Sequence, residues 1–255
     1  MRAGIQSFTI TPARTLAVLL GIIAVLVAVH AFATVAEFGF GHDYLFGLAR
    51  IVNFDGESTA PAWFSSLLLL GASLLLALIW HRQRASGGRY RFHWAGLAVV
   101  FLLLALDEAV AFHEELSEPV RNRLGAGGAF LHAWIIPYAV LGLLLLAAYV
   151  PFLRALPRRP LLLVLLAGAL YVGGAMGMEM VGGYAWDTNP VRGPAIVAIM
   201  AVEETFEMVG LAVFIYALLD YLARGSAEPG AATGSDEGAV IELRIAGRSR
   251  PTVRD

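Results

Sequence analysis

Long apolar runs alternate with short polar segments along this chain of 255 residues. A helix needs about 20 mostly apolar residues to cross the roughly 30 Å of hydrocarbon in a bilayer. Runs of this length occur near residues 15–36, 61–81, 92–116, 130–152, 161–184 and 195–222. The pattern therefore predicts an all-α, polytopic membrane bundle with six transmembrane helices, which together form one membrane domain over residues 15–224.

The two ends of the chain depart from this pattern. Residues 1–14 are predicted to form a cytoplasmic segment. Residues 225–255 are rich in Gly, Ala, Ser and acidic residues, which predicts a disordered tail in which only Val240 to Ile245 resembles a strand. Arg14 and the apolar run after it also resemble a signal peptide, but the run continues past Ala33, which favours a retained first span.

The arginines predict the orientation of the bundle, because loops rich in Lys and Arg stay in the cytoplasm. Arginines gather before the first span, between the second and third spans, and between the fourth and fifth. The opposite loops are acidic instead. Both termini are therefore predicted to be cytoplasmic, in a cell membrane such as the bacterial inner membrane. The acidic residues of the outer loops are Glu37, Asp43, Asp55, Glu57 and Asp187.

Composition supports a membrane protein and excludes several kinds of chemistry. Hydrophobic residues make up 58% of the chain and charged residues only 15%, unlike a soluble domain of this length. The chain has no cysteine, which excludes thiolate nucleophiles, disulfides and iron–sulfur ligation. It also has no lysine, so a Schiff-base mechanism is excluded. A net charge of -2 gives no support for binding to nucleic acid.

Acidic side chains inside three of the predicted spans are the main indication of function. No Lys or Arg lies within FLLLALDEAVAFHEEL, GGAMGMEMVGG or AIMAVEETFEMVG to pair with them. One carboxylate at mid-membrane costs about 2.5–3.5 kcal/mol even on the lenient insertion scale. Protons, a bound cation or water must therefore neutralise these groups, and such residues usually mark a functional site. The six acids are Asp107, Glu108, Glu179, Glu203, Glu204 and Glu207.

The acids share a depth in the predicted membrane. At about 1.5 Å per residue from the cytoplasmic helix ends, all six lie about 21–27 Å up, with His30 at about 21 Å and His132 near 30 Å. Glu204 and Glu207 can share one helix face, and a regular third helix superimposes Asp107 and Glu114. We therefore expect a single convergent site in the outer half of the bundle.

This combination of carboxylates and imidazoles favours a divalent metal ion. Oxygen-rich ligation with some nitrogen suits Fe or Mn, and Zn is also compatible. The Glu-x-x-His spacing of soluble di-iron bundles and the His-Glu-x-x-His motif are both absent. Glu204 and Glu114 are predicted to be catalytic proton shuttles. The predicted metal ligands are Asp107, Glu108, His113, Glu179, Glu203, Glu207, His132 and His30.

Three classes of function fit this site. The first is a metal-dependent oxidoreductase or hydrolase in the membrane that acts on a lipid or another apolar molecule. The second is a cation or proton transporter that uses the same carboxylates, and the third is a non-catalytic membrane subunit. Because the site lies near the outer interface, we expect water and ions to enter from that side, above apolar inner halves of the helices.

Overall fold

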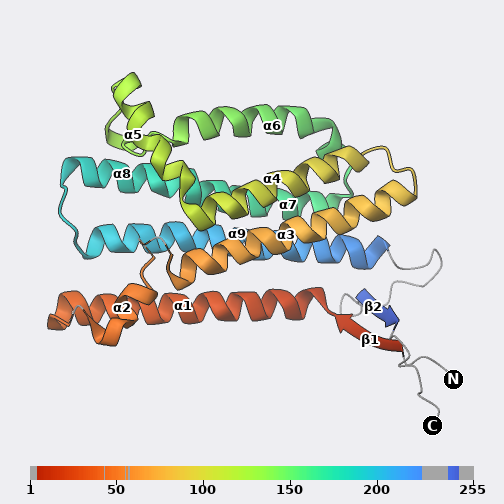
Figure 1. Ribbon diagram of the computed structural model, residues 1–255, viewed down its shortest axis with the longest axis horizontal. Coiled ribbons are helices and arrows are strands. Elements are labelled where there is room, and N and C mark those ends of the chain that lie inside the picture. The colour runs from red at the N-terminus through yellow and green to blue at the C-terminus, as the bar shows by residue number, and fades with distance from the viewer. Residues whose placement is uncertain (1–4, 43, 55, 57, 226–240, 247–255) are drawn as a thin grey trace, which may run out of the picture.

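The computed structural model describes residues 5–42, 44–54, 56, 58–225 and 241–246 of the chain. Within these residues, six helical segments are long and apolar enough to cross a membrane, which confirms the predicted fold class. Figure 1 shows them running side by side as one bundle. The spans are α1 (Pro12–Phe40), α3 (Ala60–Ala85), α4 (Arg91–Val110), α6 (Ile135–Ala155), the α7 to α8 segment (Arg158–Thr188) and α9 (Pro194–Gly225).

Helix α9 is the central element, because it packs against α1, α3 and α7. Its inner half is buried and mainly apolar, apart from Asp220, which pairs with Arg159 and Arg224. Leu211 and Leu218 are fully enclosed together with Leu69 and Leu76 of α3. Gly210 allows α7 to approach closely, since a Cβ at this position would lie 2.7 Å from a backbone nitrogen of α7. The inner half of the bundle thus has a densely packed and mainly apolar core.

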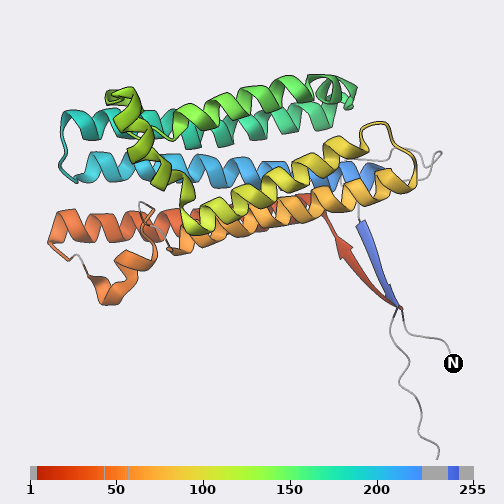
Figure 2. The ribbon, with the colours of Figure 1, turned by 45° about the horizontal axis from the view of Figure 1, so that its top comes forward.

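The third span ends earlier than predicted. The sequence predicts a helix to residue 116, but α4 ends at Val110, and Ala111 adopts the left-handed conformation with φ 51° and ψ 40°. A new helix, α5 (Phe112–Leu124), then runs in another direction (Figure 2). Asp107 stabilises this break, because its Oδ1 accepts the backbone N–H of His113 at 3.0 Å. The prediction that Asp107 and Glu114 lie on one face of one helix is therefore wrong.

The fifth span is interrupted beside one of the predicted site residues. Helix α7 (Arg158–Val172) passes into a π-helical turn, η3 (Gly173–Met178), and α8 (Glu179–Thr188) begins at Glu179. A π-helical turn adds a residue to the helical repeat, so it changes the direction in which the following side chains point. The turn therefore sets the orientation of Glu179 relative to α9.

The first and last described segments form a small antiparallel ribbon outside the bundle. Strand β1 (Ile5–Ile10) pairs with β2 (Ile241–Ala246), with Ile5 opposite Ala246 and Ile10 opposite Ile241. The ribbon lies at the end of the bundle that carries the α3–α4 and α6–α7 loops (Figure 1), where the arginines gather. The first and last described segments thus lie on one side of the bundle, and the cytoplasmic orientation of both termini stays a prediction. Residues 226–240 and 247–255 of the predicted tail lie outside the described residues.

The opposite end of the bundle carries short helices between the spans. The segment η1 (Leu45–Gly47) and α2 (Leu48–Ile51) folds back beside α1. The turn η2 (Gly128–Phe130) packs against α8. The predicted site residues lie near this end, which we call the outer end.

Candidate functional site

A hydrogen-bonded group at the break between α4 and α5 forms the first part of the site. Oδ2 of Asp107 lies 3.1 Å from Nδ1 of His113 and accepts the hydroxyl of Tyr138 at 3.2 Å. The Trp134 ring lies beside the His113 ring, with centroids 4.7 Å apart. Asp107 thus holds both the backbone N–H and the ring of His113. The aromatic neighbours of that ring come from α6 and the residue just before it. We call Asp107, His113 and Tyr138 the aspartate–histidine–tyrosine group.

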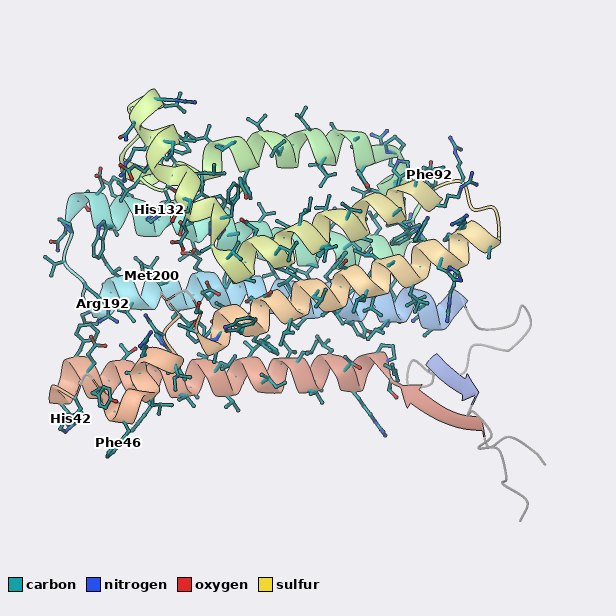
Figure 3. The ribbon with its side chains drawn as sticks, in the orientation of Figure 1. His42, Phe46, Phe92, His132, Arg192 and Met200 are labelled. Atoms are coloured by element: carbon teal, nitrogen blue, oxygen red, sulfur yellow. The ribbon has the colours of Figure 1, made fainter. Side chains whose placement is uncertain are left out.

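Glu179 forms the second part of the site. Its Oε1 accepts the indole N–H of Trp134 at 3.2 Å and lies 3.2 Å from Nδ1 of His132. Figure 3 shows His132 beside α8. The carboxyl group of Glu179 also interacts with that of Glu203 on α9. Trp134 therefore lies between the two carboxylate–imidazole pairs and contacts both.

The acids of α9 face this group from the centre of the bundle. Glu204 interacts electrostatically with Glu108, Glu179 and Glu114, and Glu207 with Glu204, Glu108 and Glu179. Oε2 of Glu204 is buried and has no hydrogen-bond partner among the described residues. The structure thus brings together acids from α4, α5, α8 and α9, which lie far apart in the sequence.

This arrangement does not have the geometry of a metal centre. Within the part of the chain that the structure describes, no three histidine, aspartate or glutamate side chains are grouped so that they could hold a metal ion. Several of the predicted ligands instead bind each other in pairs, as in Asp107 with His113 and Glu179 with His132. The donor types suit a hard divalent ion, but their placement does not fit one.

His30 lies in a different environment from the other predicted ligands. It is buried, its Nδ1 lies 3.0 Å from the carbonyl oxygen of Val52, and its ring lies 4.6 Å from that of Phe54. These contacts hold the segment after α2 against α1. The sequence could not reveal this role, because it depends on a loop that folds back onto the helix.

The acidic outer loops, on the side where we expect water and ions to enter, are only partly described. Glu37 of α1 forms a hydrogen-bonded ion pair with Arg192 of the α8–α9 loop, so part of its charge is already neutralised. Figure 3 shows Arg192 reaching towards α1. Of the other acids of the outer loops, Asp187 accepts the backbone N–H of Gly128 at 2.8 Å. Asp43, Asp55 and Glu57 lie outside the described residues.

Three aromatic residues belong to the site although the sequence analysis did not select them. Trp134 and Tyr138 are four residues apart at the start of α6, so they share a face, and this spacing could have indicated their joint role. Tyr171 of α7 interacts electrostatically with Glu207 and Glu108. Together they supply hydrogen-bond donors and ring surface to a site that is otherwise acidic.

The surroundings of His113 raise its pKa. Burial alone lowers the pKa of this imidazole, but the hydrogen bond with Asp107 and the negative charges of Asp107, Glu114 and Glu108 outweigh burial. The net pKa therefore lies above the ordinary value of 6.5. The pair stabilises the fold most at pH values below 6.5, and this contribution is lost as the pH rises through the raised pKa.

We expect Asp107→Asn to lower the pKa of His113, because it removes the charge and the hydrogen bond that raise it. Diethyl pyrocarbonate modifies only neutral imidazole, so the pH midpoint of His113 labelling, mapped by peptide mass spectrometry, should shift to lower pH. Labelling of His81, which is exposed at the other end of the bundle, provides the internal control. An unchanged midpoint for His113 would show that Asp107 does not control its charge.

Comparison with known proteins gives a family without an assigned activity. Neither the curated proteins nor the solved structures contain a match to the chain. A family model matches residues 18–222, which cover all six spans except the ends of the first and last. The chain belongs to the family described as domain of unknown function DUF8692.

Proposed function

We propose that this protein is a membrane enzyme that performs acid–base chemistry on a lipid or another apolar molecule at the outer end of the bundle. The observation that supports it is the aspartate–histidine–tyrosine group. A carboxylate that binds Nδ1 of a histidine fixes the tautomer and leaves Nε2 to take up or deliver a proton. Glu204 and Glu114 lie close enough to interact electrostatically with each other, and we assign them the role of proton shuttles.

The packing below the site favours an enzyme over a transporter. A transporter must open a second route to the inner side, and transporter helices are usually broken near the binding site for that purpose. Beneath the acids, Leu69, Leu76, Leu211 and Leu218 are fully buried in one continuous core. The two breaks described beside the acids, the left-handed Ala111 after α4 and the π-helical turn, do not belong to this core. An enzyme needs access from one side or from the lipid alone.

A metal ion stays a prediction, and no step of the proposal depends on one. The present pairing of the site's acids with histidine and with each other fits proton exchange directly. We therefore assign the chemistry to the side chains.

The test is lipid turnover in proteoliposomes made from a total membrane lipid extract. We expect mass spectrometry to show one lipid species converted by the wild-type protein and by His81→Ala, which changes an exposed residue far from the site. His113→Ala and Asp107→Asn should reduce the rate by about 10²–10⁴-fold, the usual contribution of a general base.

Two further measurements on the same samples separate the alternatives. Elemental analysis of protein purified without chelator tests for near-stoichiometric Fe, Mn or Zn, and Glu203→Ala combined with Glu207→Ala should remove any such ion. A pH-sensitive dye inside the vesicles tests for proton flux, which the enzyme does not produce. Proton or cation flux that depends on Glu203 and Glu207, without any change in the lipids, would contradict the proposal and indicate a transporter.

A further inference from the structure

Helix α6 contacts the rest of the bundle mainly through its two ends. At the outer end Tyr138 binds Asp107 and Trp134 binds Glu179. At the inner end the Tyr149 hydroxyl donates to the carbonyl oxygen of His93 at 3.0 Å, and the Phe152 ring packs on that of Trp94. In Figures 1 and 2 α6 lies at the edge of the bundle.

The middle of α6 is exposed on every side. Five consecutive residues, Val140 to Leu144, are exposed, and they cover more than one full helical turn. The face towards α4 is therefore open as well. This face is marked by Tyr138, Gly142 and Tyr149, which recur at helical spacing, and a Cβ added to Gly142 would meet no atom within 4 Å.

Helix α4 shows the same opening from its own side. Gly96, Val100, Leu103 and Asp107 recur at spacings of four, three and four, so they form one stripe. Both ends of the stripe touch α6, because Asp107 binds Tyr138 and a Cβ at Gly96 would collide with the Tyr149 hydroxyl. Leu103, between them, is 59% exposed. We call the opening bounded by Val100, Leu103, Leu141, Gly142 and Leu145 the α4–α6 window.

We propose that the α4–α6 window holds one acyl chain of a lipid substrate, with the lipid's polar end at the aspartate–histidine–tyrosine group. Its boundary residues are all apolar or glycine, and it lies between two membrane-spanning helices, where lipid chains are the surrounding solvent. From Tyr138 to Tyr149 the helix rises about 16 Å, which is close to half of the roughly 30 Å hydrocarbon core and therefore to one leaflet.

The position of the window explains how an apolar substrate reaches a polar site. Its outer end is Asp107 and Tyr138 themselves, so a chain lying in the window places the attached headgroup beside His113. Its inner end is closed by the Tyr149 hydrogen bond and the aromatic contacts around Phe152. This inference rests on the proposed function, and it identifies the substrate as a lipid of the outer leaflet.

The test is photo-crosslinking with a phosphatidylethanolamine that carries a diazirine in its acyl chain, in proteoliposomes of otherwise defined lipid. We expect crosslinks on the peptide that contains Leu103. Gly142→Trp should fill the window and reduce that yield roughly tenfold, which corresponds to about 1.4 kcal/mol of binding free energy. Leu103→Trp fills it from the other wall and serves as a second variant. Ala147→Trp, on the opposite and exposed face of α6, should leave the yield unchanged.

The same variants separate this inference from the proposed function. His113→Ala should abolish lipid turnover but keep the crosslink at Leu103. If Gly142→Trp does not reduce crosslinking, the acyl chain does not lie in the α4–α6 window. If a variant loses the crosslink but keeps turnover, the substrate reaches the site by another route, and the inference is also wrong. Because the chain has no cysteine, Leu103→Cys also tests for a second copy of the chain in the window. If oxidation of this variant gives a disulfide-linked dimer, the occupant of the window is a second copy of the chain and not a lipid.

Discussion

Glu204→Met is expected to make the protein more stable and to abolish its activity. Oε2 of Glu204 is buried without a hydrogen-bond partner among the described residues, and the nearby acids Glu108 and Glu179 add unfavourable charge. Leaving one buried polar group unsatisfied costs about 1–3 kcal/mol. Methionine is similar in length and removes that cost. The melting temperature in detergent should rise by about 2–4 °C for each kcal/mol gained in a chain of this size.

The opposite effects on stability and turnover are the signature of a functional residue. A group kept for packing or for a structural hydrogen bond would lower stability when replaced, whereas a site that must exchange protons tolerates an unfavourable group in the folded state. Glu204→Gln keeps the shape and polarity but cannot release a proton, so it should also abolish turnover. Glu115→Gln, exposed on α5, is the matched control for both measurements. Lower stability in Glu204→Met would assign this carboxyl a structural role.

Hydrophobic pattern was sufficient for the fold, because crossing a membrane requires an unbroken apolar segment of known length. Each of the six predicted spans corresponds to a helix, and most ends differ by a few residues. The largest error, at the end of the third span, has a physical reason. Ala111 and Phe112 continue the apolar pattern and contain no Gly or Pro, so nothing local indicates the left-handed residue. The break depends on Asp107, which accepts the backbone N–H of His113.

The candidate site was predictable in its residue types but not in its pairing, and its depth in the membrane stays a prediction. Because no basic residue lies within the same spans, the acids could be identified as candidate site residues. The helical rise along each span predicted that they lie at a similar height in the bundle. The partners of these acids depend on tertiary contacts. Glu179 binds Trp134 and His132 from the loop and the start of α6, and no spacing in the sequence predicts that contact. For the same reason the predicted convergence on a metal ion is not supported by the side-chain placement.

Gly174→Ala is expected to separate the two acidic helices and to lower both stability and turnover. A Cβ at Gly174 would lie 2.7 Å from the carbonyl oxygen of Glu203 and 3.1 Å from the backbone nitrogen of Glu207. Backbone atoms inside a helix cannot yield locally, so the π-helical turn and α9 must move apart. Overpacking of this kind costs about 1–3 kcal/mol. The movement also weakens the carboxyl–carboxyl contact of Glu179 with Glu203, which lies directly beside the turn.

Gly177 provides a control within the same turn, because it differs from Gly174 in having no close neighbour. A Cβ at Gly177 meets no atom within 4 Å, so Gly177→Ala adds no clash. Because alanine loses less backbone entropy than glycine in a helix, this variant should be neutral or more stable by about 0.5–1 kcal/mol. Thermal unfolding of both variants tests the difference in sign, and turnover measured well below melting tests the site. If the two substitutions have equal effects on stability and turnover, the turn does not tolerate alanine at either position. In that case the close contact between Gly174 and α9 does not position Glu179.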